Sequence, residues 1–237
     1  MAALATLAAG RIGRRLAGRA GERRYGPQRP PRANVGQRGE NGRPRRPKRR
    51  LPPEILTHDE VCRLLAACSD TPTGLRNRAL IALMYRSGLR VAEALALFPK
   101  DVDFAAGTIR VLHGKGDRSR TVGVDAGALA VVTPWLEARR ALPVTDLDTL
   151  LCTRDGRAVG QGYLRRLWGN LARAAGIAKR VHAHGFRHTH AAQLRAEGVD
   201  IGIISKQLGH RSITTTACYL DHICPMAVVD AIRVRAW

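Results

Sequence analysis

Acidic side chains are scarce in this 237-residue sequence, which carries 19 Asp and Glu against 40 Lys and Arg, a formal net charge of +21. Aromatic residues make up only 4% of the chain. No apolar run approaches the ~20 residues that a membrane-spanning helix needs, which argues against a helical membrane protein. The apolar fraction of 45% nevertheless suffices for a buried core. A charge excess of this size says little about fold and indicates a polyanionic partner.

The chain also lacks a cysteine pattern of the kind that builds disulfide frameworks. Its five cysteines are odd in number, and none forms a C-x-x-C pair. They are therefore predicted to be reduced thiols in a cytoplasmic protein. The opening "MAALATLAAGRIGRRLAG" places an apolar start before arginines, the reverse of a secretory signal. An organelle transit peptide stays open as an alternative.

The positive charge is concentrated at one end. Residues 1–50 carry 15 Lys and Arg against Glu22 and Glu40, whereas residues 51–237 carry 25 against 17 acidic residues. The first segment is rich in Arg, Pro and Gly and holds few large apolar side chains, so we predict a disordered basic tail. It is either a non-specific electrostatic arm for nucleic acid, or a solvated tail, or sequence upstream of the true start codon. One ordered domain is predicted over residues 51–237.

Helical periodicity dominates that domain. Thr57 followed by Glu60 predicts a capping box at the first helix, and Gly88 suits the left-handed residue after a second helix over residues 75–87. Alternating residues on both sides of "GKGD" predict a β-hairpin. We therefore expect a mainly α fold with one small antiparallel β-sheet (α+β). Further helices are expected directly after Arg90 and at about 126–140, 161–175, 186–197, 201–208, 213–220 and 226–233.

Two short motifs place a cation at a turn. In "SGLRVAEALAL", Arg90 opens a helix, and Glu93 one turn later can hold its guanidinium. At a helix start the arginine fork can face a phosphate. In "HGKGDRSRTV", Lys115 occupies the hairpin tip, where its ammonium can reach a minor groove or donate a proton. Each motif taken alone is better explained by a surface ion pair or a solvated turn lysine.

The stretch "HAHGFRHTHAAQL" contains four His within nine residues. His184 and His188 are spaced i,i+4, as in zinc-binding helices. The Glu of that motif is missing and no Cys or carboxylate lies nearby, so metal binding is disfavoured. His184 and Arg187 lie one turn apart at a helix start, where anions bind. They are therefore predicted to address one site.

The last motif is "LGHRSITTTACYLDH". His210 follows the helix-ending Gly209, and Tyr219 lies on a helix that Ser212 can cap. Nothing in the local pattern distinguishes a nucleophilic Tyr219 from a tyrosine packed in the core.

The motifs together supply every role needed for metal-free attack on a phosphodiester. Two arginine forks neutralise the non-bridging oxygens of the transition state. A Tyr hydroxyl, with a reference pKa of ~10, becomes a nucleophile when His184 accepts its proton in a positive field. Lys115 can protonate the departing 5′ oxygen, and His210 can hydrogen-bond a phosphoryl oxygen. The candidate site residues are Arg90, Lys115, His184, Arg187, His210 and Tyr219.

In their order and flanks these residues resemble the tyrosine recombinase (phage integrase) family. The matching text is "GLRVAEALAL", "HGKGDRSRTV" and "HAHGFRHTHAAQLRAEGVDIGIISKQLGHRSITTTACYL", and the resemblance covers about residues 52–235. It implies a tyrosine-recombinase-like catalytic domain in which Tyr219 is the nucleophile and the other five residues activate the phosphate. It also implies a 3′-phosphotyrosyl link and a free 5′-hydroxyl. No ATP, metal or other cofactor is then needed, because the covalent link stores the bond energy.

The resemblance further implies double-stranded DNA as partner, a homo-oligomer (a tetramer on paired DNA sites), no membrane partner and a nucleoid-associated location. The helix at residues 226–233 is expected to dock on a neighbouring subunit. Family members usually carry a separate helical DNA-binding domain before the catalytic domain, where this sequence has residues 1–50. One alternative is therefore an inactive or weakly active DNA-binding remnant of a truncated mobile-element integrase. Another is a metal-dependent hydrolase, whose activity a chelator would abolish.

Overall fold

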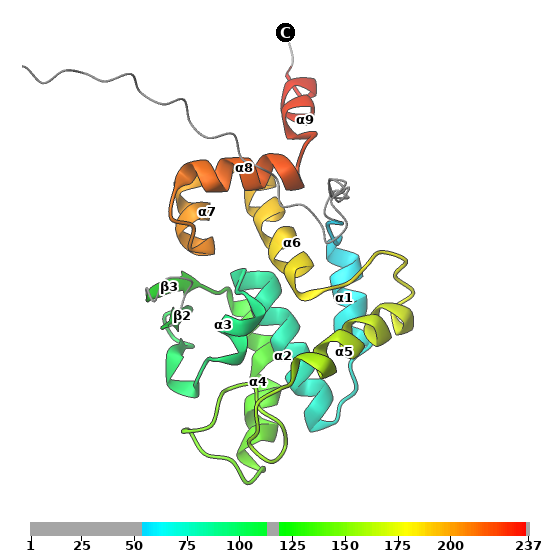
Figure 1. Ribbon diagram of the computed structural model, residues 1–237, viewed down its shortest axis with the longest axis vertical. Helices are drawn as coiled ribbons and strands as arrows, with labels where there is room; N and C mark the ends of the chain where they lie inside the picture. Colours follow the sequence, from blue (N-terminus) through cyan, green and yellow to red (C-terminus); the bar gives the residue numbers. More distant parts are fainter. Residues whose placement is uncertain (1–53, 113–118, 236–237) are drawn as a thin grey trace, which may run out of the picture. The chain divides into compact units, whose positions relative to one another are not determined.

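The computed structural model describes residues 54–112 and 119–235 of the chain (Figure 1). The predicted basic tail over residues 1–50 and the hairpin tip with Lys115 lie outside the described residues. The helices that position the site are α1 (His58–Ala66), α2 (Pro72–Ser87), α3 (Val91–Leu95), α4 (Ala126–Arg140), α5 (Gln161–Ala174), α6 (Ala183–Ala196), α7 (Ile201–Leu208), α8 (Ile213–Ile223) and α9 (Ala227–Arg233), with a 3₁₀ turn at Pro99–Asp101.

A three-stranded antiparallel sheet flanks the helices, in the order β1 (Val102–Asp103), β2 (Thr108–Val111) and β3 (Arg120–Gly123). Ile109 of β2 lies opposite Val122 of β3, and both side chains are buried. The predicted hairpin is therefore confirmed, as is the mainly α fold with a small antiparallel sheet. The two-residue strand β1 was not predicted, because so short a strand shows no periodicity in the sequence.

Helix starts show where the sequence signals were strong. Thr57 and Glu60 form the predicted capping box of α1. The structure corrects the start of α2 from residue 75 to Pro72, because the Thr71 side chain caps Gly74 N and proline suits the first helical turn. It also corrects the start of α6 from residue 186 to Ala183. Both His184 and Arg187 thus lie in the first turns of one helix.

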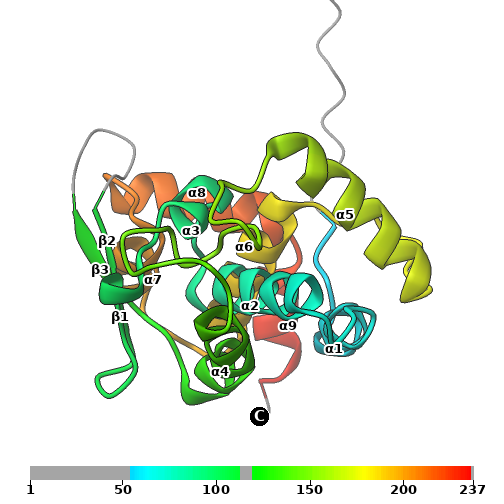
Figure 2. The same cartoon turned by 90° about the horizontal axis from the view of Figure 1, so that it is seen from below.

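The central helix α2 is buried on nearly all sides. It packs side by side with α4, and also against α6 (Figure 2). From α4, Trp135 is almost fully buried and its indole Nε1 donates to Leu150 O at 2.9 Å. No helix among residues 54–112 and 119–235 is long and apolar enough to cross a membrane.

A second apolar cluster holds α6, α7 and α8 together, and Figure 1 shows these three helices packed against one another. Leu220 of α8 is fully buried in it and Ile223 is nearly so. Burying one such side chain contributes about 1.5–3 kcal/mol. The neighbour of Tyr219 in the sequence therefore anchors α8, and Tyr219 is fixed at the edge of this cluster.

Two left-handed glycines end helices beside the same region. Gly88 follows α2 with φ 64° and Gly209 follows α7 with φ 65°. A Cβ atom at Gly88 would lie 2.6 Å from the His190 ring, and one at Gly209 would lie 2.7 Å from Arg120 Nε. Because only glycine combines this backbone conformation with so little space, the two turns bring the residues after them close to α6.

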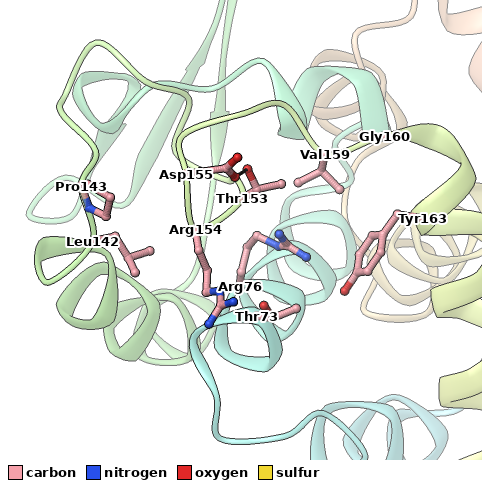
Figure 3. Close-up of a pocket in the computed structure, with 10 residues that line it drawn as sticks. All are labelled: Thr73, Arg76, Leu142, Pro143, Thr153, Arg154, Asp155, Val159, Gly160 and Tyr163. Atoms are coloured by element: carbon pink, nitrogen blue, oxygen red, sulfur yellow. Dashed lines mark hydrogen bonds between the residues drawn. The ribbon is translucent and has the colours of Figure 1, made fainter.

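A cavity of about 690 Å³ lies at the other end of α2, beside the first turn of α5 (Figure 3). Arg76 lines it and is 5% exposed. Its guanidinium donates to Cys152 O at 3.3 Å and to Asn77 Oδ1 at 3.1 Å, and lies 5.0 Å from the centre of the Tyr163 ring. Arg76 thus ties the loop before α5 to α2. The described candidate site residues are absent from this cavity's lining.

Candidate active site

Arg90 opens α3 as predicted and is held by Glu93. Arg90 Nη1 donates to Glu93 Oε1 at 2.7 Å, and the Arg90 backbone N–H donates to Glu93 Oε2 at 2.8 Å. A second arginine, Arg120 at the start of β3, donates from both terminal nitrogens to the same two oxygens at 2.9 Å. The Glu93 side chain is only 3% exposed. The surface ion pair considered from the sequence is therefore a buried carboxylate between two arginines.

The charge state of Glu93 follows from these partners. Burial alone would raise the pKa of its carboxyl, but the bonds from Arg120 and from the Arg90 backbone lower it to about 2. Glu93 is consequently a carboxylate at any neutral pH. Its task is to hold the Arg90 guanidinium, whose side chain is 32% exposed, in one orientation toward the open side of the site.

Replacing Glu93 with Gln is expected to destabilise the fold. The amide would remove the buried negative charge and turn an NH₂ group toward the donors of Arg90 or Arg120, so these arginines lose their carboxylate partner. Breaking a buried ion pair from one side costs about 3–5 kcal/mol in free energy of unfolding, measured by urea denaturation. The matched control is Asp59→Asn, because Asp59 pairs with Arg63 on the surface of α1 and such pairs contribute little. Equal stability of the two variants would contradict this role for Glu93.

Arg187 lies deepest in the site and is 1% exposed. Its Nη1 donates to Gly88 O and its Nη2 donates to Leu208 O. These carbonyls belong to the C-terminal ends of α2 and α7, where helix dipoles favour a cation. Burial, and then the charge of Arg90, lower the pKa of the guanidinium to about 10, so it stays positive at neutral pH.

His210 is fixed in one tautomer by its neighbours. Its Nε2 lies 3.4 Å from Arg187 Nη2, and its Nδ1 lies 2.9 Å from Thr216 Oγ1. Because arginine only donates, Nε2 accepts, and Nδ1 carries the hydrogen that it donates to Thr216. Burial lowers the pKa of His210 to about 4, so the ring is neutral at neutral pH. The sequence predicts that His210 hydrogen-bonds a phosphoryl oxygen, and a bond donated by Nε2 would require the other tautomer.

Tyr219 is both packed and directed at this site. Its ring stacks on His188 with centroids 5.2 Å apart and planes at 22°, and meets the His210 ring edge-on at 5.3 Å. The hydroxyl oxygen is buried and has no hydrogen-bond partner among the residues that the structure describes. Burial raises the pKa of Tyr219 to about 12, against the lowering effect of Arg187 and Arg90. The phenol is therefore neutral and needs activation.

His184, the predicted base, contacts His188, and His188 contacts Tyr219. Burial and the nearby Arg187 lower the pKa of His184, so it is neutral and able to accept a proton. Its ring meets His188 at 4.4 Å, and His188 in turn stacks on Tyr219. Within the described parts of the chain, no group of three or more His, Cys, Asp and Glu side chains could hold a metal ion.

The structure thus brings together Arg90, Arg187, His184, His210 and Tyr219, while Lys115 lies outside the described residues. Sequence reasoning missed three supporting residues, namely Arg120, His188 and Thr216. For Thr216 a signal existed, because its place three residues before Tyr219 puts both on one helix face. For Arg120 the alternation of the strand indicates only a side chain that faces inward, and nothing in the sequence indicates its partner Glu93.

A family model and several known proteins match this chain. The model described as "Phage integrase family" matches residues 54–223. Tyrosine recombinase XerC of Xanthomonas axonopodis pv. citri (strain 306) is 36% identical over 186 residues, which cover 78% of this chain and 60% of that protein. The chain therefore spans less than two thirds of the length of this relative.

Solved structures of recombinases share the fold. The crystal structure of XerA recombinase superimposes with a TM-score of 0.67 at 28% identity, over 79% of this chain and 68% of that chain. The XerH site-specific recombinase bound to its palindromic difH substrate, in a post-cleavage complex, gives a TM-score of 0.64 at 29% identity, over 78% and 54% of the two chains.

Proposed function

Because the chain belongs to the phage integrase family, we propose that it is a site-specific DNA recombinase that cuts and rejoins strands through a tyrosine-linked intermediate. The observation that carries the proposal is the Tyr219 hydroxyl, which is buried without a partner among the described residues and lies within the field of Arg187 and Arg90. Two relatives support DNA as the partner, since they are a tyrosine recombinase and a recombinase solved on its DNA substrate.

In the proposed cleavage step, Tyr219 Oη attacks the phosphorus of one DNA strand. The new O–P bond joins the tyrosine to the 3′ phosphate, and the bond from phosphorus to the 5′ oxygen breaks. The phenolic proton goes to His184, which contacts the His188 ring rather than Tyr219, so the transfer runs through a water or follows a shift of the rings on DNA binding. The departing 5′ oxygen takes a proton from Lys115. Attack by a second 5′-hydroxyl on the phosphotyrosine reverses these bonds and reseals DNA, so no energy source is consumed.

Arg90 and Arg187 stabilise the charge that develops on the non-bridging oxygens. The partly exposed Arg90 fork is preorganised by Glu93, and the Arg187 fork by two backbone carbonyls. Donors that are already oriented need no reorganisation during the reaction, so they stabilise the transition state effectively. His210 can add a hydrogen bond to a phosphoryl oxygen when its proton is on Nε2, the nitrogen that lies beside Arg187 Nη2.

The partner of the apolar C-terminal helix is proposed to be a second copy of the chain. Met226 and Ile232 expose 54% and 59% of their surface, although both are apolar. A cavity of about 790 Å³ lies between this helix and α6, α7 and α8; Met226 and Asp230 border it together with apolar residues of those three helices. Exchange of this helix would join copies into the tetramer on paired sites that the family resemblance implies.

An Ile232→Asp variant is expected to bind DNA as a monomer and to lose assembly on paired sites, because a carboxylate would replace an exposed apolar side chain at the contact between copies. Light scattering of the protein–DNA complex measures the assembly. Assembly equal to that of the unchanged chain would contradict docking through α9.

We further propose that residues 51–237 form the catalytic domain, that residues 1–50 add salt-sensitive affinity for DNA, and that the protein works at the nucleoid.

The test of the function uses a pool of nicked duplexes with randomised arms, incubated with the full chain in a chelator. Denaturant-stable protein–DNA adducts are collected and their DNA is sequenced. The proposal expects such adducts and one enriched sequence. Binding without any adduct would favour the DNA-binding remnant, and cleavage only with metal would favour a hydrolase.

A further inference from the structure

We propose that His188 is a positioning residue for the nucleophile, whose imidazole ring forms the flat surface that sets the orientation of the Tyr219 ring. The proposal rests on the recombinase function and adds a residue to its site. Sequence spacing had singled out His188 only as a possible metal partner of His184.

The ring of His188 supports the Tyr219 ring through a nearly parallel contact. Its ring is nearly parallel to the Tyr219 ring, at 22° and 5.2 Å, while His210 meets the same tyrosine edge-on at 79°. The two imidazoles therefore restrict rotation of the phenol about its side-chain bonds from two directions. His188 is itself held, because it is 8% exposed and its ring also meets the His184 ring at 4.4 Å and 71°.

The same geometry argues against His188 as the base. The polar atoms of an imidazole act in the plane of its ring, and the phenolic oxygen lies in the plane of the tyrosine. In a nearly parallel stack these two planes do not point at each other, so a nitrogen of His188 is not aimed at the hydroxyl. Transfer of a proton requires a hydrogen-bond approach between the two atoms. Contact between ring faces supplies orientation instead.

The position of His188 in the chain explains why this orientation matters. It follows Arg187 directly on α6, so one rigid helix carries both the arginine proposed to bind the phosphate and the surface that holds the nucleophile. Tyr219 belongs to a different helix, α8, whose placement depends on Leu220 and Ile223. The stack therefore links the tyrosine to the phosphate site. A misplacement of the nucleophile by 1 Å can slow the reaction by roughly 10²-fold.

The charge of His188 suits this task. Burial lowers its pKa to about 4, and the neighbouring His184, His182, His222 and Arg187 act in the same direction. The ring is therefore neutral at neutral pH and adds no charge beside the phosphate site. Its Nδ1 is buried and has no hydrogen-bond partner in the described parts of the chain, so substitution removes no hydrogen bond between that atom and those residues.

Two substitutions of His188 distinguish the contribution of its flat ring from that of its ring nitrogens. His188→Phe keeps a flat ring and removes both nitrogens, whereas His188→Asn keeps a polar atom near Nδ1 and removes the ring. On the DNA recovered by adduct capture, the Phe variant is expected to cleave at nearly the wild-type rate with an unchanged pH profile. The Asn variant is expected to cleave about 10²-fold more slowly with unchanged DNA affinity. The matched control is His58→Asn, because His58 is an exposed histidine of α1 outside the candidate site, and this variant is expected to cleave as wild type.

A second measurement needs no activity. The chain has four tyrosines, so ring-labelled tyrosine gives a simple NMR spectrum, and Tyr219→Phe identifies the Tyr219 signal. Stacking on His188 is expected to shift that signal, and the shift should survive in His188→Phe and vanish in His188→Asn. If the shift is present but the wild type forms no adduct, the recombinase function fails while the stack stands. Full activity of the Asn variant, or equal loss of activity in both variants, would overturn the positioning role.

Discussion

Tyr219→Phe is expected to abolish the covalent protein–DNA adduct, with strand cleavage reduced by at least about 10³-fold, as when a catalytic nucleophile is removed. The change deletes one oxygen atom. The ring that remains can still stack on His188 and meet His210 edge-on, so the site around it is unchanged. DNA affinity, measured by fluorescence anisotropy, should therefore equal that of the wild type.

The same substitution is expected not to destabilise the fold. The hydroxyl oxygen is buried and has no partner among the described residues, and removing an unsatisfied polar group costs no hydrogen bond. The matched control is Tyr85→Phe, because the Tyr85 hydroxyl accepts from Gln193 Nε2 at 2.7 Å away from the site. That variant should lose stability and keep the adduct. Adduct formation by Tyr219→Phe would show that another residue attacks DNA.

Arg187→Lys is expected to reduce the rate of adduct formation by about 10²–10³-fold, the effect of losing one oriented donor at a developing charge. The positive charge is retained, so the loss reports geometry. The Arg187 fork reaches Gly88 O with one nitrogen and Leu208 O with the other. A lysine ammonium is a single point and cannot hold both carbonyls and a phosphate oxygen pair.

Arg187→Lys is also expected to lower the free energy of unfolding, because two buried carbonyls lose their donors. The loss of activity therefore has to be measured on folded protein. The matched control is Arg63→Lys, since Arg63 also donates to two backbone carbonyls, Ala175 O and Gly176 O, but its side chain is 43% exposed. Both variants are compared by single-turnover cleavage at a temperature where each is folded. Wild-type cleavage by Arg187→Lys would contradict the assigned role of Arg187.

The sequence was sufficient where the signal was local. Periodicity and caps predicted the helices, the glycine-centred turn predicted the hairpin, and the spacing of Arg90 and Glu93 predicted their contact. The order of the chemical groups along the chain also indicated a phosphate site with a tyrosine nucleophile. Most of these inferences depend on residues within one or two helical turns of each other. The phosphate site was inferred from which chemical groups the chain contains, without knowing how far apart they lie in the fold.

The sequence was insufficient where packing between distant elements decides. Glu93 and Arg120 are 27 residues apart, and no spacing rule joins a helix start to a strand start. His188 was visible as a neighbour of His184 on α6, but the tyrosine ring that lies against it comes from another helix. The buried state of Thr216 among three consecutive threonines likewise depends on which face of α8 meets α6 and α7.

The most direct test of the central claim is the chemical location of the DNA link. The full chain is incubated with the captured DNA in a chelator, the adduct is digested with protease and nuclease, and the modified peptide is sequenced by mass spectrometry. The account predicts a nucleotide joined through its 3′ phosphate to Tyr219, without metal. A link to any other residue, or strand cleavage that leaves no protein-linked nucleotide, would contradict it.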